Sequence, residues 1–356
     1  MKSSQIQWTD HTFNPWWGCE KVSPGCKHCY AEKFADKRLH LKVWGAQAER
    51  RIASEKTWAD PLKWNAEAAK EGKRARVFCA SMADVFESYE GPSAERVKEA
   101  RERLWALIEV TPWLDWLLLT KRPQNIHGML SHRWGIASFP KNLWLGCTVE
   151  NQEEANRRLP LLLDINCALR FVSYEPALEP IDFTKIKLDE WCAHCESHVT
   201  LNALTHGSVS CECGSEATTL TQLSWVIVGG ESGNGARPFN PAWALSTVEQ
   251  CQGQGVPVFV KQMGSNPTLR SGSGWGPVRA TKGDNQDEWP KQLRVREFPD
   301  AERKYQHTDR CQSEQGPVTL TRAEADALRD LLEYVRQGWG GAHVETVKML
   351  QEKVGK

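Results

Sequence analysis

Three cysteines lie within eleven residues near the start of the chain, in the stretch FNPWWGCEKVSPGCKHCYA. Cys19, Cys26 and Cys29 follow the spacing C-x6-C-x2-C, whose two-residue gap lets two thiolates reach one metal centre from a single turn. A structural zinc site is normally closed by four ligands, whereas three thiolates suit a [4Fe–4S] cluster that keeps one iron open. We therefore expect an iron–sulfur cluster. The alternatives are zinc, with His28 or His11 as a fourth ligand, and cysteines that bind no metal.

A second group of cysteines occupies residues 192–213, in the stretch CAHCESHVTLNALTHGSVSCEC. A C-x2-C pair and a C-x-C pair are what a tetrahedral zinc ribbon needs. The C-x-C pair is tighter than the common C-x2-C pair, so His194, His198 or His206 is an alternative ligand. A second iron–sulfur cluster and the absence of metal are further alternatives. The ligands that we predict for structural zinc are Cys192, Cys195, Cys211 and Cys213.

The composition is that of a soluble globular protein, with 40% hydrophobic and 25% charged residues among 356. A formal net charge of zero gives no support to a strongly basic nucleic-acid binder, although a local basic face is compatible with it. The N-terminal residues lack the apolar stretch of a signal peptide, and no run approaches the roughly 20 apolar residues of a membrane span. We expect a cytoplasmic protein without a membrane partner, whose twelve cysteines serve metal binding or catalysis before disulfides.

Short apolar runs alternate with helical segments along the chain. Continuous runs of this kind read as strands buried on both faces, and the segment 93–110 between two of them has apolar residues at helical spacing after Ser93 as an N-cap. The alternation predicts a parallel sheet in a partial (β/α) barrel of about six or seven strands. The runs that we assign to strands are 76–81, 115–123, 143–151, 169–176, 224–233 and 256–264.

Polar residues follow these strands where each strand ends. Parallel strands aim their following loops at one common mouth, so we expect a functional site there. The residues concerned are Ser81 and Asp84, Thr120 to Arg122, Thr148 to Asn151, Ser173 to Glu175, Glu231 and Ser232, and Lys261 and Gln262.

The remaining segments complete the expected domain organisation. The barrel is divided into residues 1–183 and 223–300 by a zinc-ribbon-like insert at 184–222, which we expect near the mouth, and 265–290 form a loop or lid. Residues 301–356 form a helical extension.

The motifs resemble those of known families. Three cysteines after the first strand of a parallel barrel are similar to the radical S-adenosylmethionine superfamily, whose usual spacing is C-x3-C-x2-C. A closer resemblance, carried by WTDHTFNPWWGCEKVSPGCKHCYA, WLGCTVENQ, RFVSYEPALEPI and WVIVGGESGNGARPF over most of residues 5–300, is to an uncharacterised phage and bacterial family with a three-cysteine motif. VFCASMADVF and LLLTKRP are similar to segments of spore photoproduct lyase, a radical enzyme that repairs DNA.

The superfamily resemblance implies a cluster whose open iron binds S-adenosylmethionine, a 5′-deoxyadenosyl radical that abstracts hydrogen, and a reductant such as flavodoxin or ferredoxin. By their position at strand ends, the residues expected to hold S-adenosylmethionine are Ser81, Asp84, Thr148, Glu150, Gly229, Gly230 and Glu231.

Four cationic residues make the expected mouth basic, which suits a phosphate-bearing substrate. They are Lys121, Arg122, Arg237 and Lys261, and the alternative is that they are solvated or paired with Glu150, Glu175 and Glu231. Tyr174 and Cys147 are candidates to donate a hydrogen atom or relay a radical, although packing is the simpler role for both.

The basic mouth, the ribbon, the lyase similarity and the 17 tryptophans favour a nucleic acid or nucleotide as substrate. Most of the tryptophans are expected to pack, and some to stack on bases. The alternative is a zinc-bearing, non-radical protein that binds nucleic acid or acts as a phage or bacterial interaction module through residues 317–356.

Overall fold

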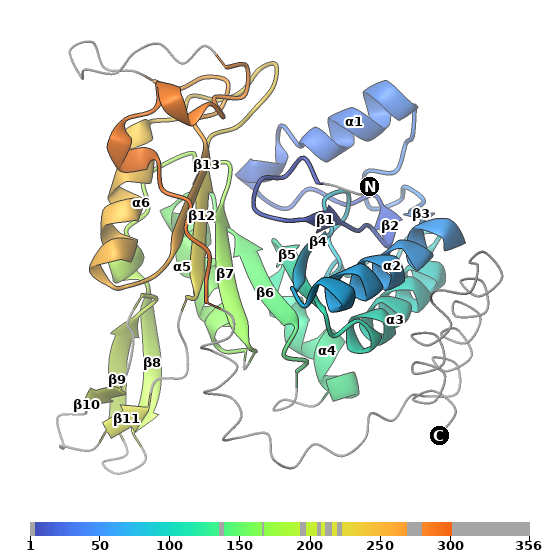
Figure 1. Ribbon diagram of the computed structural model, residues 1–356, viewed down its shortest axis with the longest axis horizontal. Coiled ribbons are helices and arrows are strands. Elements are labelled where there is room, and N and C mark those ends of the chain that lie inside the picture. The colour runs from blue at the N-terminus through green and yellow to red at the C-terminus, as the bar shows by residue number, and fades with distance from the viewer. Residues whose placement is uncertain are drawn as a thin grey trace.

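A computed structural model describes residues 4–134, 139–165, 167–192, 197–204, 208–210, 216–218, 223–268 and 280–300 (Figure 1). Its centre is a seven-stranded sheet in the order β1-β4-β5-β6-β7-β12-β13, in which every neighbouring pair is parallel. The sheet curls into a half-barrel with helices around it, so the predicted fold class is confirmed.

The elements fall close to the predicted runs. The sheet contains β1 (His11–Thr12), β4 (Ala75–Cys79), β5 (Leu114–Thr120), β6 (Leu143–Thr148), β7 (Leu169–Tyr174), β12 (Trp225–Gly229) and β13 (Val258–Gln262). The helices are α1 (Tyr30–Leu39), α2 (Glu55–Glu71), α3 (Ala94–Val110), α4 (Ile126–Trp134), α5 (Gln152–Leu163) and α6 (Pro241–Gly253). Ser93 precedes α3 as predicted, but its hydroxyl accepts a hydrogen bond from the Arg50 backbone instead of capping the helix.

Both faces of the sheet are buried because successive side chains of a strand point to opposite sides. In β7, Phe171 belongs to a cluster inside the half-barrel, whereas its neighbour Val172 packs in the larger core between the sheet and the helices. The inner cluster consists of Trp8, Phe78, Leu117, Trp144, Leu169, Phe171, Trp225, Ile227 and Phe259. Tryptophans therefore serve mainly as packing in this part of the fold.

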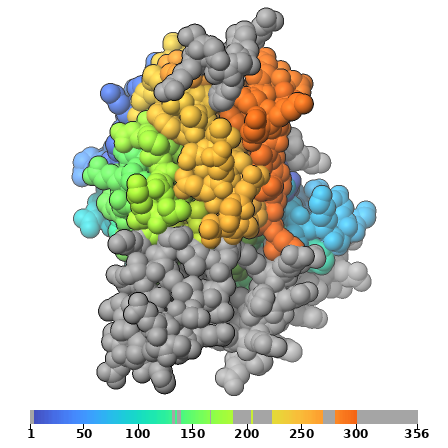
Figure 2. Space-filling model, turned by 90° about the vertical axis from the view of Figure 1, so that its left-hand side faces the viewer, coloured from blue at the N-terminus to red at the C-terminus, as the bar shows by residue number. Residues whose placement is uncertain are grey.

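Side chains and a loop, instead of further strands, span the gap between the two edges of the half-barrel. Val260 of β13 donates its backbone N–H to Val295, and Phe298 lies under the guanidinium of Arg76 from β4 at 4.0 Å. Figure 2 shows α5 in green, α6 in yellow-orange and residues 280–300 in orange as one continuous surface on this side of the molecule.

The segment between β7 and β12 carries two antiparallel hairpins, β8 (Lys187–Cys192) with β9 (Ser197–Asn202) and β10 (Ser208–Ser210) with β11 (Glu216–Thr218). We expected this insert near the mouth, and that expectation is wrong: it lies at the amino end of the sheet, away from α1 (Figure 1). After the insert, Ser224 donates to the carbonyl of Arg170 at the start of β7. Because β7 and β12 are parallel neighbours, their connection must return to the amino edge, and the insert lies at the end of that return.

Several expectations fall on residues outside the described part of the chain. They include the zinc ligands Cys195, Cys211 and Cys213, the side chain of Cys192 and the extension 301–356. No helix within the described ranges is both long and apolar enough to cross a membrane.

Candidate active site

A cavity of about 1040 Å³ lies at the carboxyl ends of the strands, where the sequence predicted a mouth. Cys19, Cys26 and Cys29 all line it, all three are free thiols, and each is partly exposed. Over the described residues, no three His, Cys, Asp or Glu side chains converge closely enough to hold a single metal ion. The three thiols thus share one cavity.

The loop that carries the cysteines begins directly after β2 (Trp16–Trp17), which pairs with β3 (Arg51–Ile52). Gly18 has a φ of +118°, and a Cβ there would lie 2.3 Å from the Val43 carbonyl, so this position requires glycine. Pro24 starts a short 3-10 turn that ends at Cys26, and Cys29 occupies the N-cap position of α1 without a side-chain capping hydrogen bond. The turn residues of the motif therefore set the loop geometry locally.

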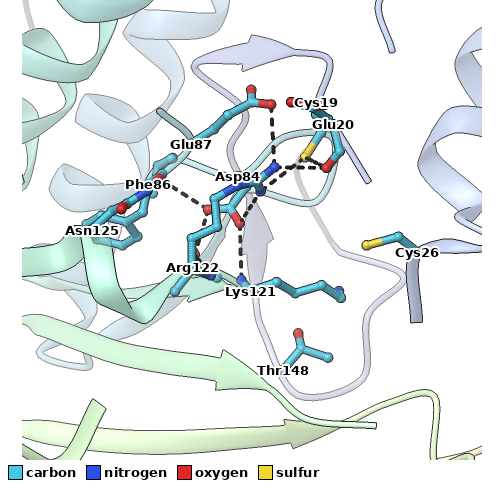
Figure 3. Close-up of polar contacts among 12 residues, drawn as sticks. Cys19, Glu20, Cys26, Asp84, Phe86, Glu87, Lys121, Arg122, Asn125 and Thr148 are labelled. Carbon is cyan, nitrogen blue, oxygen red and sulfur yellow. Dashed lines mark hydrogen bonds and ion pairs between the residues drawn. The ribbon is translucent and has the colours of Figure 1, made fainter. Parts of the chain in front are cut away.

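Arg122, at the carboxyl end of β5, holds the first cysteine (Figure 3). Its guanidinium donates to the Sγ of Cys19 at 3.6 Å and to the carbonyl of Glu20 at 2.9 Å. It also forms an ion pair with Asp84 at 2.9 Å and lies 3.6 Å from Glu87. Arg122 is thus a buried residue that links the strand ends to the cysteine loop.

Asp84 organises this corner of the cavity. Its carboxylate accepts hydrogen bonds from the Thr120 hydroxyl at 2.7 Å and from the Lys121 backbone at 3.1 Å, besides the Arg122 contact. Burial, with added repulsion from Glu87 and Asp84, raises the pKa of Cys19 to about 12 despite the Arg122 guanidinium. A metal at this thiol must therefore displace a firmly held proton.

Glu150, which follows β6, contacts the middle of the cysteine loop. It accepts from the Ser23 hydroxyl at 2.5 Å and from the Arg158 guanidinium at 2.8 Å, and its own side chain is fully buried. A Cβ at Gly25 would lie 2.2 Å from the Glu150 carboxylate, so the loop rests directly on that side chain. Glu150 does not line the cavity; it supports the cysteine loop.

Glu231, after β12, contacts the cysteine loop at His28. Arg237 donates to both of its oxygens, at 2.9 and 3.1 Å, and His28 lies 3.1 Å from one of them. Arg237 also donates to the carbonyl of Pro24 at 2.8 Å. Burial raises the pKa of Glu231, but the hydrogen bonds and charge of Arg237, with a smaller part from His28, outweigh it and lower that pKa below its ordinary value.

The predicted cations differ in whether they are paired. Arg122 and Arg237 are bound as described, and Lys261 forms an ion pair with Glu175 at 2.9 Å. Lys121 alone of the four forms no ion pair with any described residue, and its side chain extends into the space between Thr148 and Cys26 (Figure 3). Its charge is close enough to counteract part of the raised pKa that burial gives Cys29. Arg237 and Lys261 are thus paired with carboxylates that the alternative named, whereas Arg122 is paired with Asp84, which it did not name.

The cavity gathers most of the predicted site residues but not all of them. Thr148 and Ser173 line it, whereas Cys147 and Tyr174 point to the other face of the sheet and are fully buried in the outer core. Gly229 packs against Glu175 outside the cavity. The predicted residues that line the cavity are Cys19, Cys26, Cys29, Ser81, Asp84, Thr120, Lys121, Arg122, Thr148, Ser173, Glu175, Gly230, Glu231, Ser232, Lys261 and Gln262.

Ser173 and Glu175 were predicted at the mouth, and both line the cavity. Strand alternation could have separated them from Tyr174, because they share their side of β7 and its following loop with inward-facing Phe171. The support given by Ser23 and by Asn14, which accepts a hydrogen bond from the Met82 backbone at 2.7 Å, had no signal in the sequence.

Two comparisons with solved structures describe likenesses of the fold. A cysteine-to-serine variant of spore photoproduct lyase aligns with a TM-score of 0.33 and 14% identity over 49% of this chain and 47% of that chain. A tyrosine-to-phenylalanine variant aligns with a TM-score of 0.32 and 11% identity over 56% and 70%. This chain thus spans about half the length of the first of them.

Comparison with curated proteins gave no sequence match. Residues 3–315 match the model of the family described as "Protein of unknown function (DUF5131)". An uncharacterised family was expected from the motifs. Since the match covers most of its length, the chain belongs to the DUF5131 family.

Proposed function

We propose that this protein is a radical S-adenosylmethionine-like iron–sulfur enzyme that modifies or repairs a nucleic acid or nucleotide. The observation that carries the proposal is the position of three free, partly exposed thiols of one loop, which open into a cavity at the carboxyl ends of a parallel half-barrel. In such a fold the strand ends supply the polar groups of a site.

The donor set fits a [4Fe–4S] cluster better than a single ion. Cys19, Cys26 and Cys29 would each bind a different iron and leave the fourth iron open, whereas a structural zinc ion is normally held by four protein ligands. The cluster with S-adenosylmethionine would supply the radical chemistry. Arg122, Glu150 and Arg237 bond to the loop at Glu20, Ser23 and Pro24, which would position the thiols for a cluster.

The cavity can accept more than the cluster. Its volume is at the upper end of the roughly 300–1000 Å³ of small-molecule sites, which leaves room for S-adenosylmethionine beside part of a substrate. The hydroxyls of Ser81, Thr148 and Ser173 offer hydrogen bonds to an amine, carboxylate or ribose. The Lys121 ammonium is a cation available for a carboxylate or phosphate. The aromatic inner cluster closes the bottom of the half-barrel to water.

A zinc-bearing, non-radical protein is the second candidate, and the position of His28 favours it. His28 lines the same cavity as the three cysteines, so it is placed to approach a metal there. His11 is not among the residues that line the cavity, because its ring stacks on Trp64 at 4.3 Å. The zinc alternative therefore depends on His28.

Metal analysis separates the two candidates. The full chain would be purified anaerobically, and iron, sulfide, zinc and the visible spectrum would be measured for wild type, Cys26→Ala and the control Cys251→Ala, whose buried thiol lies on α6. We expect about four irons per chain with a broad absorption band that Cys26→Ala loses and Cys251→Ala keeps, followed by reductive cleavage of S-adenosylmethionine. Zinc in the place of iron, diminished by His28→Ala, would establish the second candidate instead.

A further inference from the structure

The helix that follows the cysteine loop has a face that the described structure leaves partly exposed to solvent. With about 100° between successive residues, five side chains of α1 follow one another around the axis at intervals of about 20–40°. In that order they are Lys33, Lys37, Tyr30, Phe34 and Arg38, so two adjacent aromatic rings are flanked by cations on both sides. The buried positions Ala31 and Ala35 follow next around the axis.

The two rings on this face are exposed but held in place. Tyr30 is 58% exposed while its hydroxyl donates to the carbonyl of Ser81 at 2.8 Å. Phe34 is 40% exposed and lies 6.2 Å, ring centre to ring centre, from Trp17. Exposing such rings costs free energy unless a ligand covers them, and a ring with a fixed orientation loses little entropy when it binds.

The acidic and basic residues of α1 differ in whether they form ion pairs. Its acidic residues are neutralised locally, Glu32 by Lys21 at 2.6 Å and Asp36 by Lys42. Lys33, Lys37 and Arg38, in contrast, form no ion pair with any residue that the structure describes. In a chain with no net charge, this helix presents an uncompensated positive face next to its aromatic rings. The ligand that complements it is anionic and carries flat rings.

This face is continuous with the candidate active site. Trp17, Tyr30 and Phe34 line the same cavity as the three cysteines, and Tyr30 directly follows Cys29. An extended polymer lying along α1 would therefore bring one of its units to the mouth of the cavity.

We propose that Tyr30 and Phe34, with Trp17 beside them, form a stacking surface for the unpaired bases of a single-stranded polynucleotide, whose phosphates contact Lys33, Lys37 and Arg38. Bases stack on aromatic side chains in any sequence, and cations beside the rings follow the phosphate backbone. This inference names the substrate class of the proposed function and rests on it for the chemistry that follows binding. The binding itself requires none of the cysteines.

Direct binding tests the proposal. The anisotropy of a fluorescein-labelled single-stranded oligodeoxythymidylate would be titrated with the full chain, with oligouridylate and a DNA duplex as further arms. Phe34→Ala should weaken binding of the single strands by about 5- to 150-fold, the loss expected for one stacked base. The matched control is Trp113→Ala, which removes a ring of similar exposure, 37%, just before β5 at the other edge of the sheet, and it should bind like wild type.

The charges are tested by salt. Lys37→Gln should reduce the slope of log affinity against log salt by about 0.7, the value for one phosphate contact on a single strand. Preference for deoxythymidylate or for uridylate would tell whether DNA or RNA is the substrate. Equal loss in Phe34→Ala and Trp113→Ala, unchanged binding in Phe34→Ala, tighter binding of the duplex, or no binding at all would overturn the proposal. If the iron–sulfur function fails instead, the purified protein would contain no cluster. The wild type would still bind single strands, and Phe34→Ala would still weaken that binding.

Discussion

The cysteine loop and the helix α1 that follows it differ in how the rest of the chain contacts them. The cysteine loop is fixed by side chains from three strand ends, through Arg122, Glu150 and Arg237. The helix α1 that follows it has a face whose two aromatic rings, Tyr30 and Phe34, are 58% and 40% exposed. The loop's polar groups are bonded within the chain, whereas Lys33, Lys37 and Arg38 of α1 form no ion pair with any residue that the structure describes.

The difference indicates separate tasks. A group of thiols that must hold a cluster needs its geometry set before the cluster arrives, and buried ion pairs do this at the cost of desolvation. A surface that accepts a long, variable ligand needs available charge and exposed rings. Mutations in the loop should therefore reduce stability and metal binding together, and mutations on α1 should reduce neither.

The largest effect is expected at Glu150. Glu150→Ala removes the carboxylate below the loop and takes from the buried guanidinium of Arg158 one of its two anionic partners. Breaking a buried ion pair costs about 3–5 kcal/mol of the free energy of unfolding. Chemical denaturation would measure this loss, and metal analysis should show that less iron is retained. Glu249→Ala on the exposed side of α6 is the control and should be neutral within about 0.5 kcal/mol.

Gly25 comes next, because a side chain there meets Glu150. Gly25→Ala places a Cβ about where the Glu150 carboxylate lies, at 2.2 Å, and should cost about 1–3 kcal/mol. Gly128→Ala is the matched control, since a Cβ at this exposed position of α4 meets nothing within 4 Å and should stabilise the helix by up to about 1 kcal/mol. A Gly25→Ala protein as stable as wild type, with full iron content, would show that the loop does not depend on this contact.

Arg122 should give a smaller loss of stability with a specific readout. Arg122→Lys keeps a positive charge near Asp84 but loses the fork that reaches both Cys19 and the Glu20 carbonyl. We expect a loss of about 1 kcal/mol and a lower reduction potential of the cluster, because hydrogen bonds to cluster sulfurs raise it. An unchanged potential measured by redox titration would contradict the contact with Cys19. Lys261→Arg, whose ion pair is with Glu175, should leave the potential unchanged.

The fold could be read from the sequence because it depends on local patterns. The six apolar runs became strands, and their carboxyl ends gathered Ser81, Thr148 and Lys261 around one cavity as predicted. The sequence-based prediction of which residue of a strand faces the cavity was less successful, since the candidates Cys147 and Tyr174 point away from it. Alternation from inward-facing Trp144 and Phe171 contained that information.

Other features depend on contacts between distant parts of the chain, which no local pattern encodes. Glu150 and Glu231 were expected to bind a cofactor, yet both are engaged by the cysteine loop and by arginines. The insert was expected near the mouth because it follows a strand end, but the connection returns to the amino edge before β12. The face of α1 was not predicted at all, since its exposure depends on which side of the helix the half-barrel covers.

The smallest effect on stability is expected on that face, and it is the sharpest test of the comparison. Phe34 is 40% exposed, and its ring contact is with Trp17, which is itself only partly buried. Phe34→Ala should therefore change the free energy of unfolding by less than about 0.5 kcal/mol and leave the iron content unchanged. A residue that contributes to neither stability nor metal binding and yet weakens the binding of single strands would be explained by a role at the surface alone. A large loss of stability in Phe34→Ala would instead place α1 with the loop as part of one supporting structure, and the division between the two regions would not hold.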